Sequence, residues 1–440
     1  MQNETKSFLT FHQVGFLSVW LAVLSIVDAR SVRAADWSQF RGPNHDSTSP
    51  EKILKQWPAE GPRQLWKTPL TDGFSSFTVS HGRAFSLVQR SIDSANQEVC
   101  VALNADTGKE LWAVPLGVAK YDGGGDSGTS DNKGGDGPRS TPTIDGEKVY
   151  AFSGRLVLYC LEAVTGKTIW KMDLIAEHAG QNIRWQNAAS PMIDGDLIFV
   201  AGGGPGQSLL AINKTDGRVV WKGQAEIMTH STPVATIIHG ERQVIFFTQS
   251  GLVSVAEQTG ALLWKQPFKY STSTAMTPVV AGDIVYCSAG YGVGSGAYKI
   301  SKSGGSFSAK ELWFQPANVI NNHWSTPVYK DGYLYGLFGF KEHGKCPLKC
   351  VELATGNVIW SQDGFGPGGC ILVDGDLLVL GDAGQLVLVE ATPKAYTEIA
   401  RAKVLSGKCW STPIVSNGRI YARSTKEGVC LDVSTKVARN

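Results

Sequence analysis

The sequence predicts an all-β protein: an eight-bladed β-propeller of four-stranded antiparallel blades, closed by an N-terminal strand that completes the last blade. Two observations carry this prediction. Three short landmarks recur in a fixed order, and a separate copy of the third landmark precedes the first repeat. Composition agrees, because 50 glycines in 440 residues indicate many tight turns. A chain of this length would ordinarily suggest about three domains, but that estimate does not hold for a repeat fold.

The first landmark is a Ser-Thr-Pro-like start to each repeat. Its copies lie at 140–142, 190–191, 231–233, 277–278, 325–327 and 411–413, with weaker copies at 77–79 and 369–371. The second landmark is a two-residue turn that ends in glycine between alternating apolar segments, which is the sequence form of a β-hairpin. The turn glycines are Gly82, Gly146, Gly195, Gly240, Gly282, Gly332, Gly375 and Gly418. Their spacing of 42 to 64 residues fits blades of four short strands.

The third landmark is Thr-Gly-x-x-x-Trp or a close relative, and it ends six of the repeats. The last repeat stops near 434–435 without a fourth strand, while a separate copy of the motif ending lies at 64–67. We therefore expect the strand around Trp66 to complete the C-terminal blade and leave no open sheet edge. The tryptophans assigned to packing between blades are Trp66, Trp112, Trp170, Trp221, Trp264, Trp313 and Trp360.

The chain begins with a candidate export signal. Residues 14–27 form a short apolar run, Lys6 precedes it, and small residues follow at 31–35. We expect a Sec-type signal peptide over 1–34, a lead-in segment over 35–59 and the propeller over 60–440, in a periplasmic or secreted protein. An uncleaved anchor stays open, because charged residues near 28–33 are unusual in a cleavage region. A net charge of +2 gives no reason to expect a nucleic-acid partner.

The Thr-Gly-x-x-x-Trp ending, repeated around an eight-fold ring, resembles the quinoprotein-like propeller family, also called PQQ-like repeats, over roughly 60–440. Residues 36–43 also resemble the mature N-terminus of secreted bacterial members. The family includes alcohol and sugar dehydrogenases that use pyrroloquinoline quinone with Ca²⁺. It also includes non-catalytic propellers, such as the scaffold lipoprotein of the outer-membrane β-barrel assembly machinery. The shared fold does not choose between these two classes.

By analogy with the family, a ligand would bind at the end of the central channel, among the loops that lead into the inner strands. Equivalent positions of a closed ring face one axis, so their side chains converge. We call these side chains the collar: Arg139, Asn187, His230, Thr274, Asn322, His323, Trp324, Lys408 and Trp410. Cations and indoles suit a planar anionic molecule. The alternative is that the polar groups only cap strand ends and bind water.

A quinone dehydrogenase needs carboxylates for Ca²⁺ and a general base, and the sequence provides few. The loops 265–275, 314–325 and 401–411 contain no Asp or Glu. Neither an adjacent cysteine pair nor a Cys-x-x-Cys-His haem motif occurs. The Gly/Asp-rich run 122–137 lacks the known calcium-loop patterns, which favours a surface loop over a metal site. No nucleophile–base pairing suggests a hydrolase.

Eight cysteines in an exported chain raise the question of disulfides. Cys160, Cys350 and Cys430 occupy one equivalent blade position, and such positions on separate blades are too far apart to bond. Cys346 and Cys350 are the only close pair, so a local disulfide between them stays open. A metal site that adds His343 lacks a fourth ligand and is disfavoured.

These observations favour an exported, monomeric, non-catalytic propeller that uses its loop-bearing face for a protein partner or a small anionic ligand. We expect no resident cofactor and no metal. The alternative function is a dehydrogenase of an alcohol or sugar, dependent on pyrroloquinoline quinone and Ca²⁺, with the collar as the cofactor site.

Overall fold

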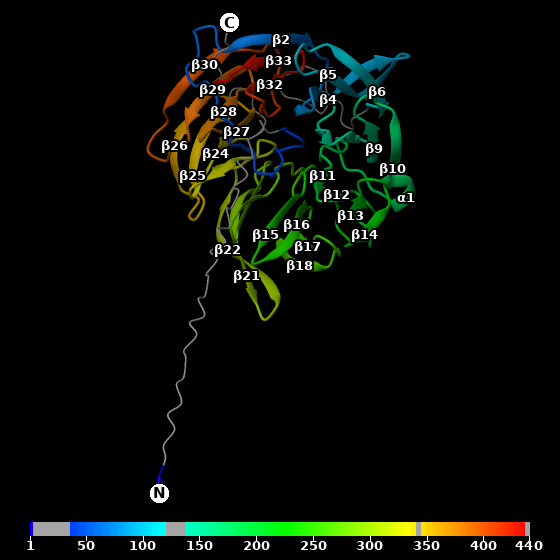
Figure 1. Ribbon diagram of the computed structural model, residues 1–440, viewed down its shortest axis with the longest axis vertical. Coiled ribbons are helices and arrows are strands. Elements are labelled where there is room, and N and C mark those ends of the chain that lie inside the picture. Colours follow the sequence, from blue (N-terminus) through cyan, green and yellow to red (C-terminus); the bar gives the residue numbers. More distant parts are fainter. Residues whose placement is uncertain (3–35, 120–136, 340–344, 436–440) are drawn as a thin grey trace. The chain divides into compact units, whose positions relative to one another are not determined.

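The computed structural model describes residues 1–2, 36–119, 137–339 and 345–435. The predicted signal peptide and the Gly/Asp-rich run therefore lie almost wholly outside the described residues, as does His343. The described residues from Asp36 onward form one unit. Within it, eight sheets stand around a ring, each with four antiparallel strands of its own, which confirms the predicted eight-bladed propeller (Figure 1). No helix among the described residues is long and apolar enough to span a membrane.

The blades are numbered along the chain, and each strand order below runs from the channel outward. Blade 1 contains β3 (Thr78–Ser80), β4 (Arg83–Ile92), β5 (Ala95–Asn104) and β6 (Glu110–Val118). Blade 2 contains β7 (Thr143–Asp145), β8 (Lys148–Phe152), β9 (Val157–Glu162) and β10 (Thr168–Asp173), followed by the short helix α1 (Leu174–His178). Blade 3 contains β11 (Met192–Asp194), β12 (Leu197–Ala201), β13 (Leu209–Asn213) and β14 (Val219–Gly223). Blade 4 contains β15 (Val234–Ile238), β16 (Glu241–Thr248), β17 (Gly251–Ala256) and β18 (Leu262–Pro267).

The second half of the ring follows the same plan. Blade 5 contains β19 (Val279–Ala281), β20 (Ile284–Ala289), β21 (Gly294–Ser303) and β22 (Ser306–Pro316). Blade 6 contains β23 (Val328–Lys330), β24 (Tyr333–Leu337), β25 (Leu348–Glu352) and β26 (Val358–Gln362). Blade 7 contains β27 (Gly369–Val373), β28 (Asp376–Leu380), β29 (Gln385–Glu390) and β30 (Glu398–Lys403). Blade 8 contains β31 (Ile414–Ser416), β32 (Arg419–Arg423), β33 (Glu427–Asp432) and β2 (Arg63–Pro69).

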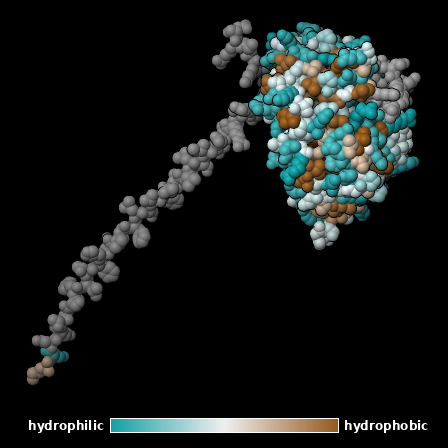
Figure 2. Space-filling view, turned by 90° about the vertical axis from the view of Figure 1, so that its right-hand side faces the viewer, coloured by the Kyte–Doolittle hydropathy of each residue, from teal (hydrophilic) through white to brown (hydrophobic). Residues whose placement is uncertain are grey.

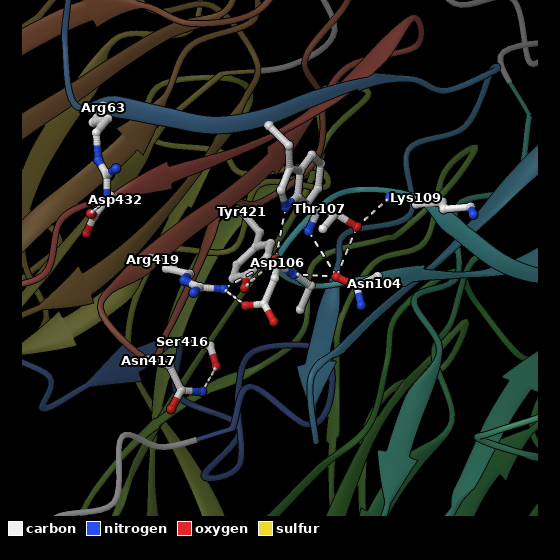
Figure 3. A network of polar contacts seen from close by, with 12 residues as sticks. Arg63, Asn104, Asp106, Thr107, Lys109, Ser416, Asn417, Arg419, Tyr421 and Asp432 are labelled. Carbon is white, nitrogen blue, oxygen red and sulfur yellow. Dashed lines mark hydrogen bonds and ion pairs between the residues drawn. The ribbon is translucent and has the colours of Figure 1, made fainter.

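The ring is closed by β2, the predicted N-terminal strand, which pairs antiparallel with β33. Trp66 of β2 stands opposite Cys430 and donates its indole N–H to the Ala105 carbonyl of blade 1 at 2.9 Å. Arg419 of blade 8 forms an ion pair with Asp106 of blade 1 across the same seam (Figure 3). The first and last blades are therefore joined by side chains that lie more than 300 residues apart in sequence.

Each blade is filled by a row of three side chains across its outer three strands. In blade 2 the row is Tyr150, Cys160 and Trp170, and the two rings meet across the small thiol with centroids 6.0 Å apart. Equivalent rows are Phe85–Ala102–Trp112, Tyr335–Cys350–Trp360 and Tyr421–Cys430–Trp66. Blade 7 has no tryptophan, and its row is Leu378, Leu388 and Ala400. A larger middle residue there fills the volume that the missing indole leaves.

The Thr-Gly turns of the repeat pack against the tryptophan of the preceding blade. A Cβ built on Gly108 would lie 2.7 Å from the ring of Trp66, and one built on Gly260 would lie 2.5 Å from Trp221. The same contact recurs at Gly166, Gly217 and Gly356. The motif therefore encodes an interface between blades, in which the glycine of one blade lies on the indole of its neighbour.

The lead-in segment crosses the central channel (dark blue in Figure 1). Trp37 bridges to Val79 of blade 1 by two backbone hydrogen bonds. The Gln39 side chain bonds both backbone groups of Ile193 in blade 3, at 3.0 and 3.2 Å. Arg41, buried, donates to the Pro327 carbonyl just ahead of blade 6 at 3.4 Å. The segment therefore connects blades on different sides of the ring.

The lead-in then runs along blades 7 and 8. Strand β1 (Thr48–Ser49) pairs parallel with β27. The Glu51 carboxylate accepts backbone N–H bonds from Asn417 at 3.1 Å and Gly418 at 2.7 Å, at a hairpin turn of blade 8. These contacts all lie on the face that carries the glycine turns, which we call the turn face. The opposite face, which carries the loops between blades, is the collar face.

The eight cysteines form no disulfide, and all are buried. Burial raises the pKa of the Cys350 thiol to about 11 and that of Cys370 to about 12. Such thiols stay protonated at neutral pH and pack as small apolar groups.

Exposed apolar side chains lie mainly on the outermost strands, for example Leu111, Ile169, Val220 and Leu262. On the face that Figure 2 shows, hydrophobic residues of the described part occur in small groups among hydrophilic ones. The outer surface shown there offers no single broad apolar patch.

Candidate binding site at the collar face

A cavity of about 370 Å³ lies at the collar end of the channel. Its walls come from the loops that lead into the inner strands of the blades, from the connection between β20 and β21, and from the lead-in segment. The lining residues are Phe40, Phe74, Ser76, Arg139, Thr141, Arg184, Trp185, Ala188, Ser190, His230, Thr232, Ser273, Ala275, Tyr291, His323, Trp324, Trp410, Ser411 and Thr412. The Ser-Thr-Pro starts thus contribute small hydroxyls between larger aromatic residues. This volume is within the usual range of ligand sites.

Phe40 belongs to the lead-in segment, and it is the residue through which that segment reaches the cavity. The neighbouring Gln39 and Arg41 are anchored to blade 3 and to the strand entrance of blade 6. The lead-in therefore supplies a fixed floor to the cavity. Sequence analysis did not predict this role, because nothing in residues 36–59 indicates where the segment lies relative to the ring.

One wall is a stack of rings with a cation. The Trp324 and Trp410 rings have centroids 4.8 Å apart, and Phe74 stacks on Trp410 at 5.4 Å. The Lys408 ammonium lies 4.6 Å from the centroid of the Trp410 ring. Because the two indoles touch, a planar ligand cannot insert between them and can only lie against their outer faces or edges.

A second wall is formed around Trp185. Its ring stacks on Tyr291 with centroids 6.3 Å apart, and the guanidinium of Arg184 lies 4.7 Å from its centroid. Trp185 and Gln186 both have a left-handed backbone, with φ of 65° and 63°. Two consecutive non-glycine residues in this conformation are strained, and such strain is often found where a side chain must be aimed at a site.

The structure brings five of the nine collar residues to the cavity: Arg139, His230, His323, Trp324 and Trp410. Lys408 is not among the lining residues, but its ammonium lies over the ring of Trp410, which is one of them. Asn187 and Asn322 instead bond nearby backbone carbonyls, of Ala189 and Leu337 respectively. Thr274 is buried, and its carbonyl accepts a hydrogen bond from the backbone N–H of His230. These last three have the strand-end role that the alternative interpretation of the collar describes.

Four aromatic lining residues were not among the predicted collar residues: Phe40, Phe74, Trp185 and Tyr291. Trp185 lies two residues before Asn187, a predicted collar residue, and this proximity in sequence is the signal that could have indicated it. Phe74 and Tyr291 lie outside the Ser-Thr-Pro landmarks, and no repeat position indicates them.

The His230 imidazole is locked in the cavity wall. Its Nε2 donates to the Arg184 carbonyl at 3.1 Å, and its Nδ1 accepts from the Ser273 hydroxyl at 2.8 Å. Burial, joined by the charge of Arg139, lowers the pKa of His230 to about 4. The ring is therefore neutral at pH 7, and the positive charge of the lining comes from the two arginines.

Replacing Arg139 with Gln is expected to raise the pKa of His230, while burial keeps it below the ordinary value of about 6.5. A histidine whose folded pKa is depressed stabilises the fold above about pH 6.5, and this contribution is lost as the pH falls towards 4. NMR titration of the His230 ring protons measures the shift. Arg218→Gln, an exposed change on the turn face, is the matched control. Equal pKa values in both variants would contradict the charge argument.

The described lining of the cavity offers no carboxylate for a quinone held with Ca²⁺. Hard cations take oxygen ligands, chiefly carboxylates, and the lining residues that the structure describes include no Asp or Glu. Among the described residues, no cluster of three or more His, Cys, Asp or Glu side chains could hold a metal ion. The arginines could pair with carboxylates of an organic anion, but these described lining residues supply no carboxylate as a cation ligand or general base.

The fold and the cavity define a class: eight-bladed propellers with a ligand-sized cavity at one end of the channel. Residues 95–336, more than half of the 440-residue chain, match the family model described as outer membrane protein assembly factor BamB. The chain belongs to this family. The assembly factor BamB of Moranella endobia is 25% identical over 320 residues, which cover 69% of this chain and 62% of the relative, so the chain spans less than two thirds of that relative.

Solved structures show the same fold. BamB from Moraxella catarrhalis superposes with a TM-score of 0.58 at 15% identity, covering 86% of this chain and 99% of that one. Quinohemoprotein alcohol dehydrogenase from Comamonas testosteroni superposes with a TM-score of 0.62 at 12% identity, covering 94% and 82%. At these identities the likeness concerns the fold alone, and it includes both a BamB protein and an alcohol dehydrogenase.

Proposed function

We propose that this protein is exported and acts as a non-catalytic binding propeller whose collar face holds a protein partner. The observation that carries the proposal is the collar cavity, which has aromatic walls, two arginines and a fixed floor, and no carboxylate among the lining residues that the structure describes. Aromatic residues and arginine are the residue types that dominate the energetic centres of protein interfaces. The His230 imidazole of this wall has both ring nitrogens bonded, so it is neutral and held by the protein itself.

The family supports this proposal. The matching family model and the Moranella relative both carry the description of an outer membrane protein assembly factor. An assembly factor acts by binding other proteins, and a rigid ring that presents one structured face is suited to that task.

Photo-crosslinking in the cells that make the protein tests the proposal. A photoreactive amino acid is placed at Lys269, an exposed residue of the loop that leads to Ser273 and Ala275. A matched position is Asp196, which is exposed on the turn face. The expected result is a crosslinked protein from position 269 and none from position 196. Crosslinks from the turn face alone would assign the partner to the other side of the ring and overturn the proposal.

The alternative, a dehydrogenase dependent on pyrroloquinoline quinone, has one observation in its favour: an enzyme of that class shares the fold over 94% of this chain. A titration with the quinone, with and without Ca²⁺, distinguishes the two functions, because the 13 tryptophans make quenching easy to follow. Saturable quenching that requires Ca²⁺, together with dye reduction by simple alcohols, would favour the enzyme.

A further inference from the structure

The hairpin turn of blade 8 contains the only Asn-Gly dipeptide in the 440-residue sequence, at Asn417 and Gly418. Both residues have a left-handed backbone, with φ of 58° and 69°, which a two-residue Asn-Gly hairpin turn requires. At the other seven turns of the ring the residue before the glycine has no side-chain amide: His81, Asp145, Asp194, His239, Ala281, Asp331 and Asp374. Among the eight turns, this one therefore combines a side-chain amide with an unhindered backbone nitrogen directly after it.

This pair of groups is the chemical requirement for deamidation. The backbone nitrogen of Gly418 attacks Cγ of the Asn417 side chain, and the new C–N bond closes a five-membered succinimide ring. The side-chain nitrogen leaves as ammonia and takes the proton of the attacking nitrogen. Water then opens the ring at either carbonyl, which leaves aspartate or isoaspartate at position 417. Asparagine is for such reasons a thermolabile residue, and a glycine after it offers the least steric hindrance to the attack.

In the folded protein both reacting groups are held by hydrogen bonds. The Glu51 carboxylate of the lead-in, which is buried, accepts the Gly418 N–H at 2.7 Å and the Asn417 N–H at 3.1 Å. The Asn417 amide nitrogen Nδ2 donates to the Ser416 hydroxyl at 3.0 Å (Figure 3). Hydrogen bonds to a charged group are roughly twice as strong as neutral ones. Because the attack moves the Gly418 nitrogen away from Glu51 and the amide away from Ser416, the folded turn opposes it while the lead-in is in place.

The product of the reaction would oppose the return of the lead-in. A new carboxylate at position 417 would lie beside that of Glu51, and like charges repel. Isoaspartate also adds a methylene to the turn backbone, which displaces the two N–H groups that Glu51 accepts. The strand after the turn carries Arg419, whose ion pair with Asp106 joins blades 8 and 1 (Figure 3). The change therefore falls where the lead-in and the closing seam meet.

We propose that Asn417 is a deamidation site that the lead-in protects through Glu51, so that release of the lead-in from blade 8 leads to a permanent charge change at this turn. The proposal concerns the turn face, and it does not depend on what the collar face binds. It adds to the proposed function a modification by which a protein whose lead-in has been released differs chemically from one whose lead-in has stayed in place.

Peptide mapping by mass spectrometry tests the protection on the mature protein, incubated at mildly alkaline pH. An isoaspartate methyltransferase assay measures the isoaspartate product separately. Glu51→Gln replaces one acceptor oxygen by a donor, and it is expected to speed deamidation at position 417 about tenfold, the factor that the loss of one charge-assisted hydrogen bond supplies. Equal rates in Glu51→Gln and in the parent protein would overturn the proposal.

Two further variants separate this protection from general loosening. Glu60→Gln removes an exposed carboxylate close to the lead-in and should leave the rate unchanged. Trp57→Ala disturbs the end of the lead-in, where the indole donates to the Leu54 carbonyl, and should speed the reaction much less than Glu51→Gln. If Trp57→Ala and Glu51→Gln speed deamidation equally, Glu51 has no particular role and its assignment is wrong.

Asn417→Asp places the product charge directly and tests its effect on the lead-in. The readout is hydrogen exchange of the Leu54 amide, which donates to the Val433 carbonyl at 2.7 Å and so reports the docking of the lead-in on blade 8. We expect this amide to exchange at least about tenfold faster in the variant than in the parent protein. Unchanged exchange would show that the new carboxylate leaves the lead-in in place, which would contradict the proposed consequence.

Discussion

Gly108→Ala is expected to lower the free energy of unfolding by about 2–5 kcal/mol, because a methyl group there has no room and the backbone does not favour one. The new Cβ would lie 2.7 Å from the ring of Trp66, and Gly108 has a φ of +69°. Trp66 belongs to β2, the strand that closes the ring, so the clash falls on the seam between blades 8 and 1. Urea unfolding followed by tryptophan fluorescence measures the loss.

Gly82→Ala separates the clash from the backbone strain. Gly82 lies in a hairpin turn of the same blade with a φ of +73°, and a Cβ there meets nothing within 4 Å. This variant should lose only about 1 kcal/mol, the usual penalty for alanine in the left-handed region. If both variants lost the same amount, the glycine–tryptophan contact would not stabilise the closure.

Trp37→Ala is expected to destabilise the protein by about 3–5 kcal/mol, as deletion of a buried tryptophan usually does. Trp37 is only 3% exposed, and it lies in the core cluster that also contains Trp66 and Phe77. Because Phe40 lies three residues further along, the cavity floor should also loosen. Urea unfolding measures the first effect, and the crosslinking yield from position 269 measures the second.

Trp57→Ala is the matched control for that variant. Trp57 is half-buried near the end of the lead-in, and its indole N–H donates to the Leu54 carbonyl at 2.9 Å. A loss well below that of Trp37→Ala, with an unchanged crosslinking yield from position 269, is expected. A Trp37→Ala variant as stable as the parent protein would show that the packing of the lead-in against the ring does not contribute to the free energy of unfolding.

The ring could be predicted from sequence because its information is local and repeated. The spacing of the turn glycines gives the number of blades, and the copy of the motif at Trp66 gives the closure, since each landmark occupies the same position in every blade. Blade 7, which lacks the tryptophan, also has a local reason. Its middle strand carries a large residue, Leu388, and its outer strand a small one, Ala400, which is the reverse of the other blades. Repetition therefore compensates for the weak signal of any single strand.

The site could be predicted only in part because its residues are not all set by the repeat. Equivalent positions supply Arg139, His230 and Trp324, which do line the cavity, but also Asn187, which turns to cap its own loop. Trp185 points to the cavity because of a strained loop conformation that no periodic pattern encodes. Phe40 reaches it because the lead-in fits across the channel, which is a property of the folded ring.

The most direct test of the central claim, that the collar cavity is where the partner binds, combines the crosslinker at Lys269 with the cavity-filling change Ala275→Phe. Crosslinking yield in cells is compared with and without this change, after urea unfolding has shown that both proteins are equally folded. We predict that filling the cavity removes most of the crosslinked partner while Arg218→Gln leaves the yield unchanged. An undiminished yield from the filled protein would show that the partner binds elsewhere.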